Sequence, residues 1–448
     1  MVENKMGYKP IGRLLIEVSF PLMISMFIQA LYNIVDSYFV MQYSEDAFTA
    51  VSLAFPLQNI MIGVAVGTGV GLNALLSRSL GEKNYSLVNK SAENGLFLSL
   101  IYSILFAIFG IFLSRFYFEV QINDKNIINL GEAYVRTVTI FSFGVFIQIF
   151  MERILQSTGK SLLTMVTQGI GAIINIILDP ILIFGRYGMP NMGITGAAAA
   201  TVIGQTLGMT IGIFLHHKFN KEVRIKGIRP DKKVIFKIYQ VGFPSIILTT
   251  LFSLSISIYN RILNTFSSTA VSALGAYFKL QSFIFMPIFG LNNGMVPIVA
   301  YNYGARKKER CIKTFKIALF TGLLIMFIGM LIFQFYSGFI LKDIYKVSDN
   351  LYKVAVPALK TISFCFLFVG YNIIIGSLFQ ALGNGILTMF GVFVRQFLGL
   401  LPTAYLLSRT GVLENVWWSF IIAEFLGVIY FSYFLKKFAL PKINNLEA

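Results

Sequence analysis

The chain has 448 residues, of which 56% are hydrophobic and 13% are charged, and its mean hydropathy is +0.73. Soluble domains are closer to half apolar and a quarter charged, so this composition excludes an ordinary water-soluble enzyme. The net charge of +17 comes from short basic clusters between long apolar segments. That placement indicates orientation in a bilayer rather than nucleic-acid binding. The composition predicts a polytopic membrane protein.

Twelve apolar stretches are long enough to cross the hydrocarbon layer, which takes about 20 helical residues. They lie near residues 14–40, 53–77, 94–116, 133–156, 163–185, 193–215, 237–262, 275–300, 315–338, 354–380, 386–408 and 415–435. With a cytoplasmic N-terminus, the inside segments carry about three times as many Lys and Arg as the outside loops, so the positive-inside rule predicts that both termini are cytoplasmic. We expect a multi-pass protein of the cell (plasma) membrane.

The polar stretch at the midpoint predicts a division into halves. Residues 216–236 form a basic cytoplasmic linker between an N-terminal six-helix lobe, 1–215, and a C-terminal six-helix lobe, 237–448. The two lobes repeat at an offset of about 223 residues, as the matched prolines Pro21 and Pro244 show. Six spans per copy is an even number, so both copies enter the membrane from the same side. The sequence therefore predicts an all-α membrane protein built from two parallel repeats.

The repeats differ where polar residues enter the spans. Asp36 aligns with Tyr259, and the pair Asn175 and Asp179 aligns with Gly399 and Thr403. An intramembrane carboxylate costs several kcal/mol unless it is paired, protonated or next to water. Packing does not explain the acids, because the second copy packs without them. We therefore assign the charge chemistry to the N-terminal lobe.

These acids share helix faces with other polar side chains. Tyr32 and Asn33 precede Asp36 by four and three residues, and Asn175 precedes Asp179 by four, so each set lies on one face. The set also includes Thr201, which follows a small-residue run in the sixth span. An all-oxygen set suits a hard cation such as Na⁺, and two nearby carboxyl groups also suit a proton. The sequence does not distinguish Na⁺ from H⁺ as the ion bound there.

Several other charged or helix-bending residues lie in or near the spans, and some allow two interpretations. Glu424 and Arg395 are expected to pair inside the C-terminal lobe, with either a structural or a substrate role. Glu152, beside Arg153, is expected to form an ion pair at the cytoplasmic side. Pro21 would kink the first span, either to couple protonation to shape or as a static bend.

The chain resembles the multidrug and toxic compound extrusion (MATE) transporters along its whole length. The resemblance rests on the strings at 31–36 (LYNIVD), 175–180 (Asn-x-x-x-Asp-Pro), 286–297 (MPIFGLNNGMVP) and 301–306 (YNYGAR). It implies a V-shaped pair of six-helix lobes with alternating access and no cofactor. It also implies export of lipophilic or cationic compounds in exchange for H⁺ or Na⁺.

The pattern of acids is similar to that of the bacterial DinF-like branch. The resemblance implies a coupling site in the N-terminal lobe, with Tyr32 and Tyr134 nearby and Pro21 as the bending proline of the first span. The positions that match the family's coupling site are Asp36, Asn175, Asp179 and Thr201. As partners we expect small-molecule drugs or toxic organic cations and membrane lipid, with no nucleic acid, and we expect a monomer.

Two other functions fit the sequence less well. A flippase for a lipid-linked saccharide would keep the fold, but it would need several cations deep in the cavity to hold a pyrophosphate. A membrane-embedded transferase or hydrolase would need a nucleophile or metal-ligand motif, and HExxH, GxSxG and DDxxD do not occur in the sequence. The sequence therefore favours a transporter over an enzyme.

Overall fold

The computed structural model describes residues 4–447, and the described chain is helical nearly throughout. Ten helices are long and apolar enough to cross a membrane, or twelve spans if each of two bent helix pairs counts as one. This confirms the predicted all-α, twelve-span membrane fold. Large apolar side chains such as Phe112, Phe320 and Phe335 are exposed, as lipid-facing residues are.

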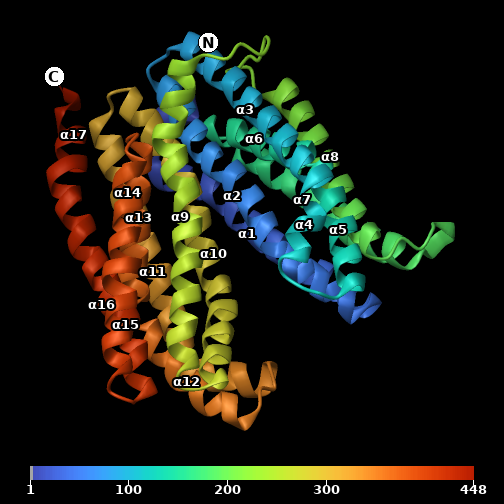
Figure 1. Ribbon diagram of the computed structural model, residues 1–448. Helices are drawn as coiled ribbons and strands as arrows, with labels where there is room; N and C mark the ends of the chain where they lie inside the picture. The colour runs from blue at the N-terminus through green and yellow to red at the C-terminus, as the bar shows by residue number, and fades with distance from the viewer. Residues whose placement is uncertain (1–3, 448) are drawn as a thin grey trace. The chain divides into compact units, whose positions relative to one another are not determined.

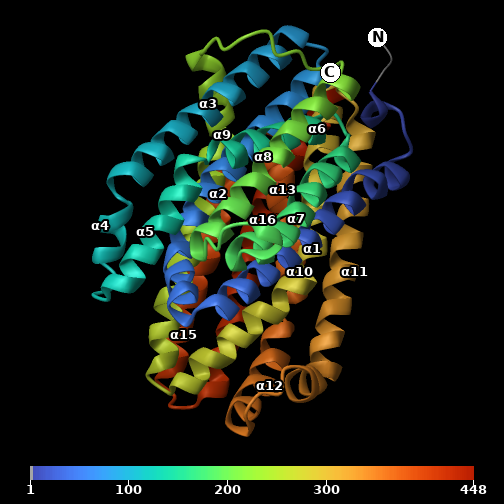
Figure 2. The same cartoon turned by 90° about the vertical axis from the view of Figure 1, so that its right-hand side faces the viewer.

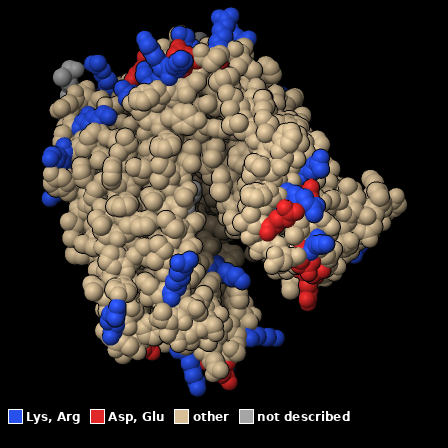
Figure 3. All heavy atoms as spheres, viewed as in Figure 1, with Lys and Arg blue, Asp and Glu red and all other residues tan. Residues whose placement is uncertain are grey.

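The helices of the first half run from blue to green in Figure 1. They are α1 (Ile11–Tyr43), α2 (Glu45–Gly81), α3 (Tyr85–Phe112), α4 (Ser114–Glu119), α5 (Lys125–Ile140), α6 (Phe143–Ser157), α7 (Ser161–Phe184) and α8 (Ile194–Phe219). The short helix α4 lies beside α5 (Figure 2). On the visible face, Lys, Arg, Asp and Glu gather near the helix ends (Figure 3). A largely uncharged surface between the charged ends is what a bilayer requires.

The second half repeats this order. It consists of α9 (Lys232–Asn264), α10 (Ser268–Gly304), α11 (Lys308–Phe339), α12 (Asp349–Ser363), α13 (Phe366–Ala381), α14 (Gly385–Phe393), α15 (Leu401–Ser408), α16 (Leu413–Phe434) and α17 (Leu440–Asn444). A π-helical segment, Val394–Leu400, joins α14 to α15. The helices α2 and α10 have 37 residues each, so these two equivalent helices of the internal repeat have the same length.

The repeat extends to the helix caps. Ser44 and Ser267 precede α2 and α10, and their hydroxyls accept hydrogen bonds from the amides of Ala47 and Ala270. A serine at this position satisfies an amide that has no partner within its helix. Equivalent local chemistry therefore starts equivalent helices in the two halves.

Two spans that the sequence predicts as single helices are bent. The fourth breaks by 45° between α5 and α6, and the tenth by 49° between α12 and α13. Neither break contains a proline. In the tenth span, Gln334 of α11 donates to the carbonyl of Lys360 at 2.6 Å and to Ser363 Oγ at 2.9 Å. A neighbouring side chain thus satisfies a helix-end carbonyl, which stabilises the bend.

The described chain divides into two compact units. The N-terminal unit is Ile24–Gly242, and the C-terminal unit is Met1–Met23 together with Phe243–Ala448. The division cuts through α1 just after Pro21 and through α9 just before Pro244. Each of these two helices therefore contributes to both units.

Glycines allow two close helix contacts: the first part of α1 packs on α10, and the first part of α9 packs on α2. A Cβ on Gly294 of α10 would lie 2.1 Å from Ser19 Oγ of α1. In the N-terminal unit, a Cβ on Gly71 of α2 would lie 2.1 Å from the carbonyl oxygen of Ile238 of α9. These glycines align in the repeat, and both are needed because only glycine allows such close backbone approach.

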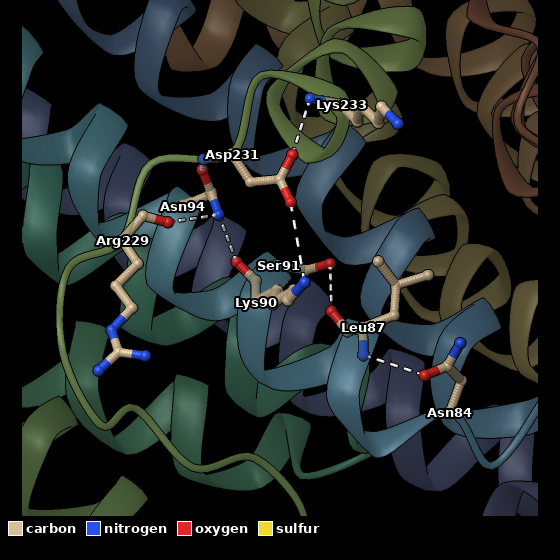
Figure 4. A network of polar contacts seen from close by, with 8 residues as sticks. All are labelled: Asn84, Leu87, Lys90, Ser91, Asn94, Arg229, Asp231 and Lys233. Carbon is tan, nitrogen blue, oxygen red and sulfur yellow. Dashed lines mark hydrogen bonds and ion pairs between the residues drawn. The ribbon is translucent and has the colours of Figure 1, made fainter.

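The segment before α9 is docked along α3 rather than free in solution. The side chain of Asn94 donates to the carbonyl of Arg229 at 3.3 Å and accepts from the amide of Asp231 at 2.8 Å. Lys90 forms an ion pair with Asp231, with an N–O distance of 3.9 Å (Figure 4). These contacts attach the chain between α8 and α9 to the N-terminal unit.

Candidate functional site

Asp36 lies on the part of α1 that belongs to the N-terminal unit. Its side chain is buried, with 8% of its surface exposed. Tyr32, one turn earlier, directs its hydroxyl to Thr201 Oγ1 of α8 at 3.4 Å. The i, i+4 spacing places Asp36 on the same face of α1 as Tyr32. Asn33 is exposed, and its side chain makes no hydrogen bond to another residue within 4–447.

The close packing of α7 against α8 brings the remaining predicted residues together. A Cβ on Gly204 of α8 would lie 2.7 Å from the carbonyl oxygen of Gly171 on α7. One turn further along α7, Asn175 Nδ2 donates to Thr201 Oγ1 at 3.2 Å. Asp179 follows on the same face and is completely buried. The two glycines therefore place Asn175, Thr201 and Asp179 together.

Four buried oxygen atoms in this cluster have no hydrogen-bond partner among the described residues. They are Asp36 Oδ1, Asn175 Oδ1 and both carboxyl oxygens of Asp179. The two carboxyl groups interact electrostatically, and neither forms an ion pair within residues 4–447. Unpartnered buried oxygens are costly unless a ligand satisfies them. The arrangement fits a hard cation or a proton.

Tyr134 of α5 lies at the edge of this cluster. Its side chain is buried and lies close enough to Asp36 and Asp179 for their negative charges to act on its hydroxyl. Its hydroxyl accepts a hydrogen bond from Gln58 Nε2 of α2 at 3.1 Å. Sequence reasoning did not select Gln58 as a site residue, although it is a glutamine within an apolar span that recurs in the second repeat as Gln281. That recurrence was the available signal.

The predicted residues Pro21, Arg395 and Glu424 lie in the C-terminal unit. Arg395 forms an ion pair with Glu424, and Asn372 Nδ2 donates to the second carboxyl oxygen of Glu424 at 2.9 Å. Sequence reasoning did not find Asn372, a lone amide on an apolar helix. Pro21 is buried in α1, and the helix continues through this residue without a break.

Glu152 does not form the predicted ion pair with Arg153 in the described chain. Instead it accepts hydrogen bonds from Gln148 and Gln168, while Arg153 donates to Gln156. Adjacent residues on a helix point about 100° apart. For this reason the two side chains meet different neighbours.

Comparisons with known proteins show the family of the chain. The MatE family model matches residues 21–181 and 244–406, which together make up most of the chain. The chain belongs to the MATE family. Its relatives include the multidrug export protein MepA of Staphylococcus saprophyticus, which is 25% identical over 91% of this chain and 89% of the relative. MepA of Staphylococcus aureus strain MSSA476 is 26% identical over 93% of this chain and 91% of the relative.

Solved structures agree on the fold. A crystal structure of MATE in the straight conformation has a TM-score of 0.90 and 21% identity, and it covers 100% of this chain and 99% of the other. The outward-facing conformation of a multidrug resistance MATE family transporter of the MOP superfamily has a TM-score of 0.90 and 22% identity with the same coverage. The protein is therefore a multi-pass MATE transporter and not an enzyme.

Proposed function

We propose that this MATE protein exports lipophilic or cationic organic compounds in exchange for H⁺ or Na⁺, with the coupling ion held by Asp36, Asn175, Asp179 and Thr201. The observation that carries the proposal is the set of four buried, unpartnered oxygens on Asp36, Asn175 and Asp179. An ion that binds there satisfies them and stabilises the conformation in which they converge. Tyr32 and Tyr134 border the site, and Pro21 bends α1 as transport proceeds.

A shared carboxyl site supports exchange because it links two binding events. If an ion and an organic cation both depend on the charge of Asp36 and Asp179, binding of one weakens binding of the other. The gradient of the ion then drives the compound out, without a cofactor. The multidrug relatives MepA support drugs or toxic organic cations as the substrate class.

The setting of this activity follows from the sequence. We place the protein in the cell membrane as a monomer surrounded by lipid. The excess of Lys and Arg in the expected inside segments supports cytoplasmic termini.

The test is ethidium efflux from proteoliposomes with an imposed H⁺ or Na⁺ gradient. Wild-type protein should export ethidium with one gradient, and Asp36→Asn and Asp179→Asn should each lose at least about tenfold in rate, as expected for loss of an intramembrane coupling carboxyl. The matched control is Glu45→Gln, which changes an exposed carboxyl of the same unit. Full gradient-driven export by both aspartate variants would refute the proposal. Binding of a lipid pyrophosphate with no ethidium export would favour the flippase instead.

A further inference from the structure

Glu152 is a buried carboxyl group that the proposed coupling site does not include. It lies on α6 with 3% of its surface exposed. Gln148 Nε2, on the same helix, donates to Glu152 Oε1 at 3.0 Å, and Gln168 Nε2 of α7 donates to Oε2 at 2.7 Å. A Cβ on Gly208 of α8 would lie 2.8 Å from Gln148 Cδ, so this glycine leaves room for the Gln148 amide. The carboxyl is therefore enclosed by two neutral amides from two helices.

The nearby cation is directed elsewhere. Arg153 packs over Gly69 of α2, where a Cβ would lie 2.7 Å from Arg153 Cγ, and it donates to Gln156. It is the one charged side chain with a resolved electrostatic effect on Glu152 among the described residues. The groups that approach from α7 and α8 are uncharged: Gln168 bonds the carboxyl, Thr164 donates to the backbone carbonyl of Glu152, and Gly208 packs against the Gln148 amide. An arginine ion pair does not hold Glu152 in its ionised form.

Glutamine partners suit a group that changes its protonation state. A side-chain amide donates through Nε2 to a carboxylate, and after a half-turn it accepts through Oε1 from a protonated carboxyl. Both forms of Glu152 can thus be hydrogen-bonded, which avoids the cost of a buried unpaired group. In the arrangement of the structure, an amide N–H group lies against each carboxyl oxygen. A proton needs one carboxyl oxygen and one turned amide, whereas a hard metal cation takes several oxygen ligands at once.

The position of Glu152 connects it with the coupling site. On α7, Gln168, Asn175 and Asp179 share one helical face, because they are spaced by seven and four residues. Gln148 Nε2 lies 4.0 Å from the Cβ position of Gly171, which is one turn from Asn175. Gln148 and Gln168, which hold the Glu152 carboxyl, are both partly exposed. Glu152 thus lies between two partly exposed amides, one of which approaches α7 one turn from Asn175.

We propose that Glu152 is a second proton-binding group of the N-terminal unit, which takes up and releases a proton as the coupling carboxyls load and unload. This inference rests on the proposed ion-coupled export and assigns the proton as the ion at Glu152. Proton relays in membrane transporters are built from carboxyl groups of this kind. The step is a proton transfer between Glu152 and water, and it needs no other reactant.

The test is a pH titration of protonated carboxyl groups by infrared difference spectroscopy on purified protein. The spectra of Asp36→Asn/Asp179→Asn with and without Glu152→Gln should differ by one titrating carboxyl component, which is present only when Glu152 is present. The substitution is isosteric, and melting temperatures report on folding. Absence of a titrating band from the double variant, or a band that Glu152→Gln leaves unchanged, would overturn the inference.

Transport provides the second readout. Glu152→Gln should lower proton-driven ethidium efflux by about a hundredfold, the smaller end of what a proton-transfer group contributes, while ethidium binding stays within about twofold. The matched control is Glu93→Gln, a buried carboxyl on α3 that accepts from the amide of Lys226, and it should export normally. Wild-type efflux by Glu152→Gln would refute this inference alone, whereas efflux by the double aspartate variant would refute the proposed function.

Discussion

At the position where the N-terminal unit carries Asp36, the C-terminal unit carries Tyr259, and the two side chains differ in their hydrogen bonding. Asp36 Oδ1 is buried without a partner among the described residues. The Tyr259 hydroxyl donates to the carbonyl of Val416 at 3.1 Å, and its ring packs on Phe420 at a centroid distance of 5.1 Å. At this position the N-terminal unit has a buried oxygen without a partner, and the C-terminal unit has a hydrogen-bonded aromatic side chain.

The same contrast holds one helix away. Asn175 points an unpartnered oxygen into the N-terminal cluster. At the aligned Gly399, a Cβ would lie 2.8 Å from Ala423 Cα, so the C-terminal unit has backbone packing where the other has a polar side chain. Arg395 and the buried Glu424 of the C-terminal unit form an ion pair with each other instead. The buried carboxyl groups of Asp36 and Asp179 thus lack an ion pair among the described residues, whereas the buried carboxyl of Glu424 has one.

The largest stability effect should come from breaking the pair in the C-terminal unit. Arg395→Met leaves Glu424 buried with Asn372 as its remaining partner, and loss of one member of a buried ion pair costs about 3–5 kcal/mol. We expect a matching fall in the free energy of unfolding in detergent. The double variant Arg395→Met/Glu424→Gln should recover most of that loss. An unchanged stability in the single variant would show that the pair is not structural.

A smaller effect is expected at the packing of α7 against α8. Gly204→Ala places a Cβ 2.7 Å from the carbonyl of Gly171 and 3.3 Å from Asn175 Cβ, and overpacking of this kind costs about 1–3 kcal/mol. Coupled efflux should also fall, because Asn175 is displaced. The matched control is Gly275→Ala on α10, where a Cβ meets nothing within 4 Å. Equal stability of the two variants would contradict the close packing.

Removing a single hydroxyl group should affect ion affinity in the N-terminal unit and only stability in the C-terminal unit. Thr201→Val takes away the acceptor for Asn175 Nδ2, and we expect ion affinity to fall about tenfold, which corresponds to roughly 1.4 kcal/mol. Tyr259→Phe removes the bond to Val416 and should cost about 1 kcal/mol of stability without changing ion affinity. Ion titrations and melting curves on both variants test this. A change in ion affinity in Tyr259→Phe would weaken the division between the units.

The smallest expected effect is that of Asp179→Asn on the free energy of unfolding. Asp179→Asn removes a carboxyl whose oxygens have no partner within residues 4–447, so without the coupling ion its free energy of unfolding should match that of wild type or exceed it by up to about 1 kcal/mol. Melting temperatures at low ion concentration measure this. A clear loss of stability would mean that Asp179 has a structural partner after all.

Sequence alone predicted the spans well, because hydropathy and the repeat act over whole helices. It did not predict the two bends, since these depend on partners such as Gln334, which lies on a different helix from the bend that it stabilises. In the site, the i, i+4 faces of α1 and α7 predicted which side chains share a helix face. Asn33 shows the limit of that reasoning, because a face spans about 100° and its edge can be exposed.

Partners across helices were harder to predict. Glu152 was expected to pair with its neighbour Arg153, but it accepts from Gln148 and Gln168. A local sequence gives no distance between α6 and α7, so Gln168 could not be recognised as a partner. Gly171 and Gly204 allow the close packing of α7 against α8. The sequence did not reveal this role, because a glycine in a membrane span can serve several purposes.

The most direct test is to measure ion release when ethidium binds to purified protein. We predict that wild-type protein and the C-terminal double variant Arg395→Met/Glu424→Gln both release H⁺ or Na⁺ on binding. Asp36→Asn/Asp179→Asn should release neither. Ion release from the aspartate double variant, or its loss in the Arg395 and Glu424 variant alone, would contradict a coupling site in the N-terminal unit.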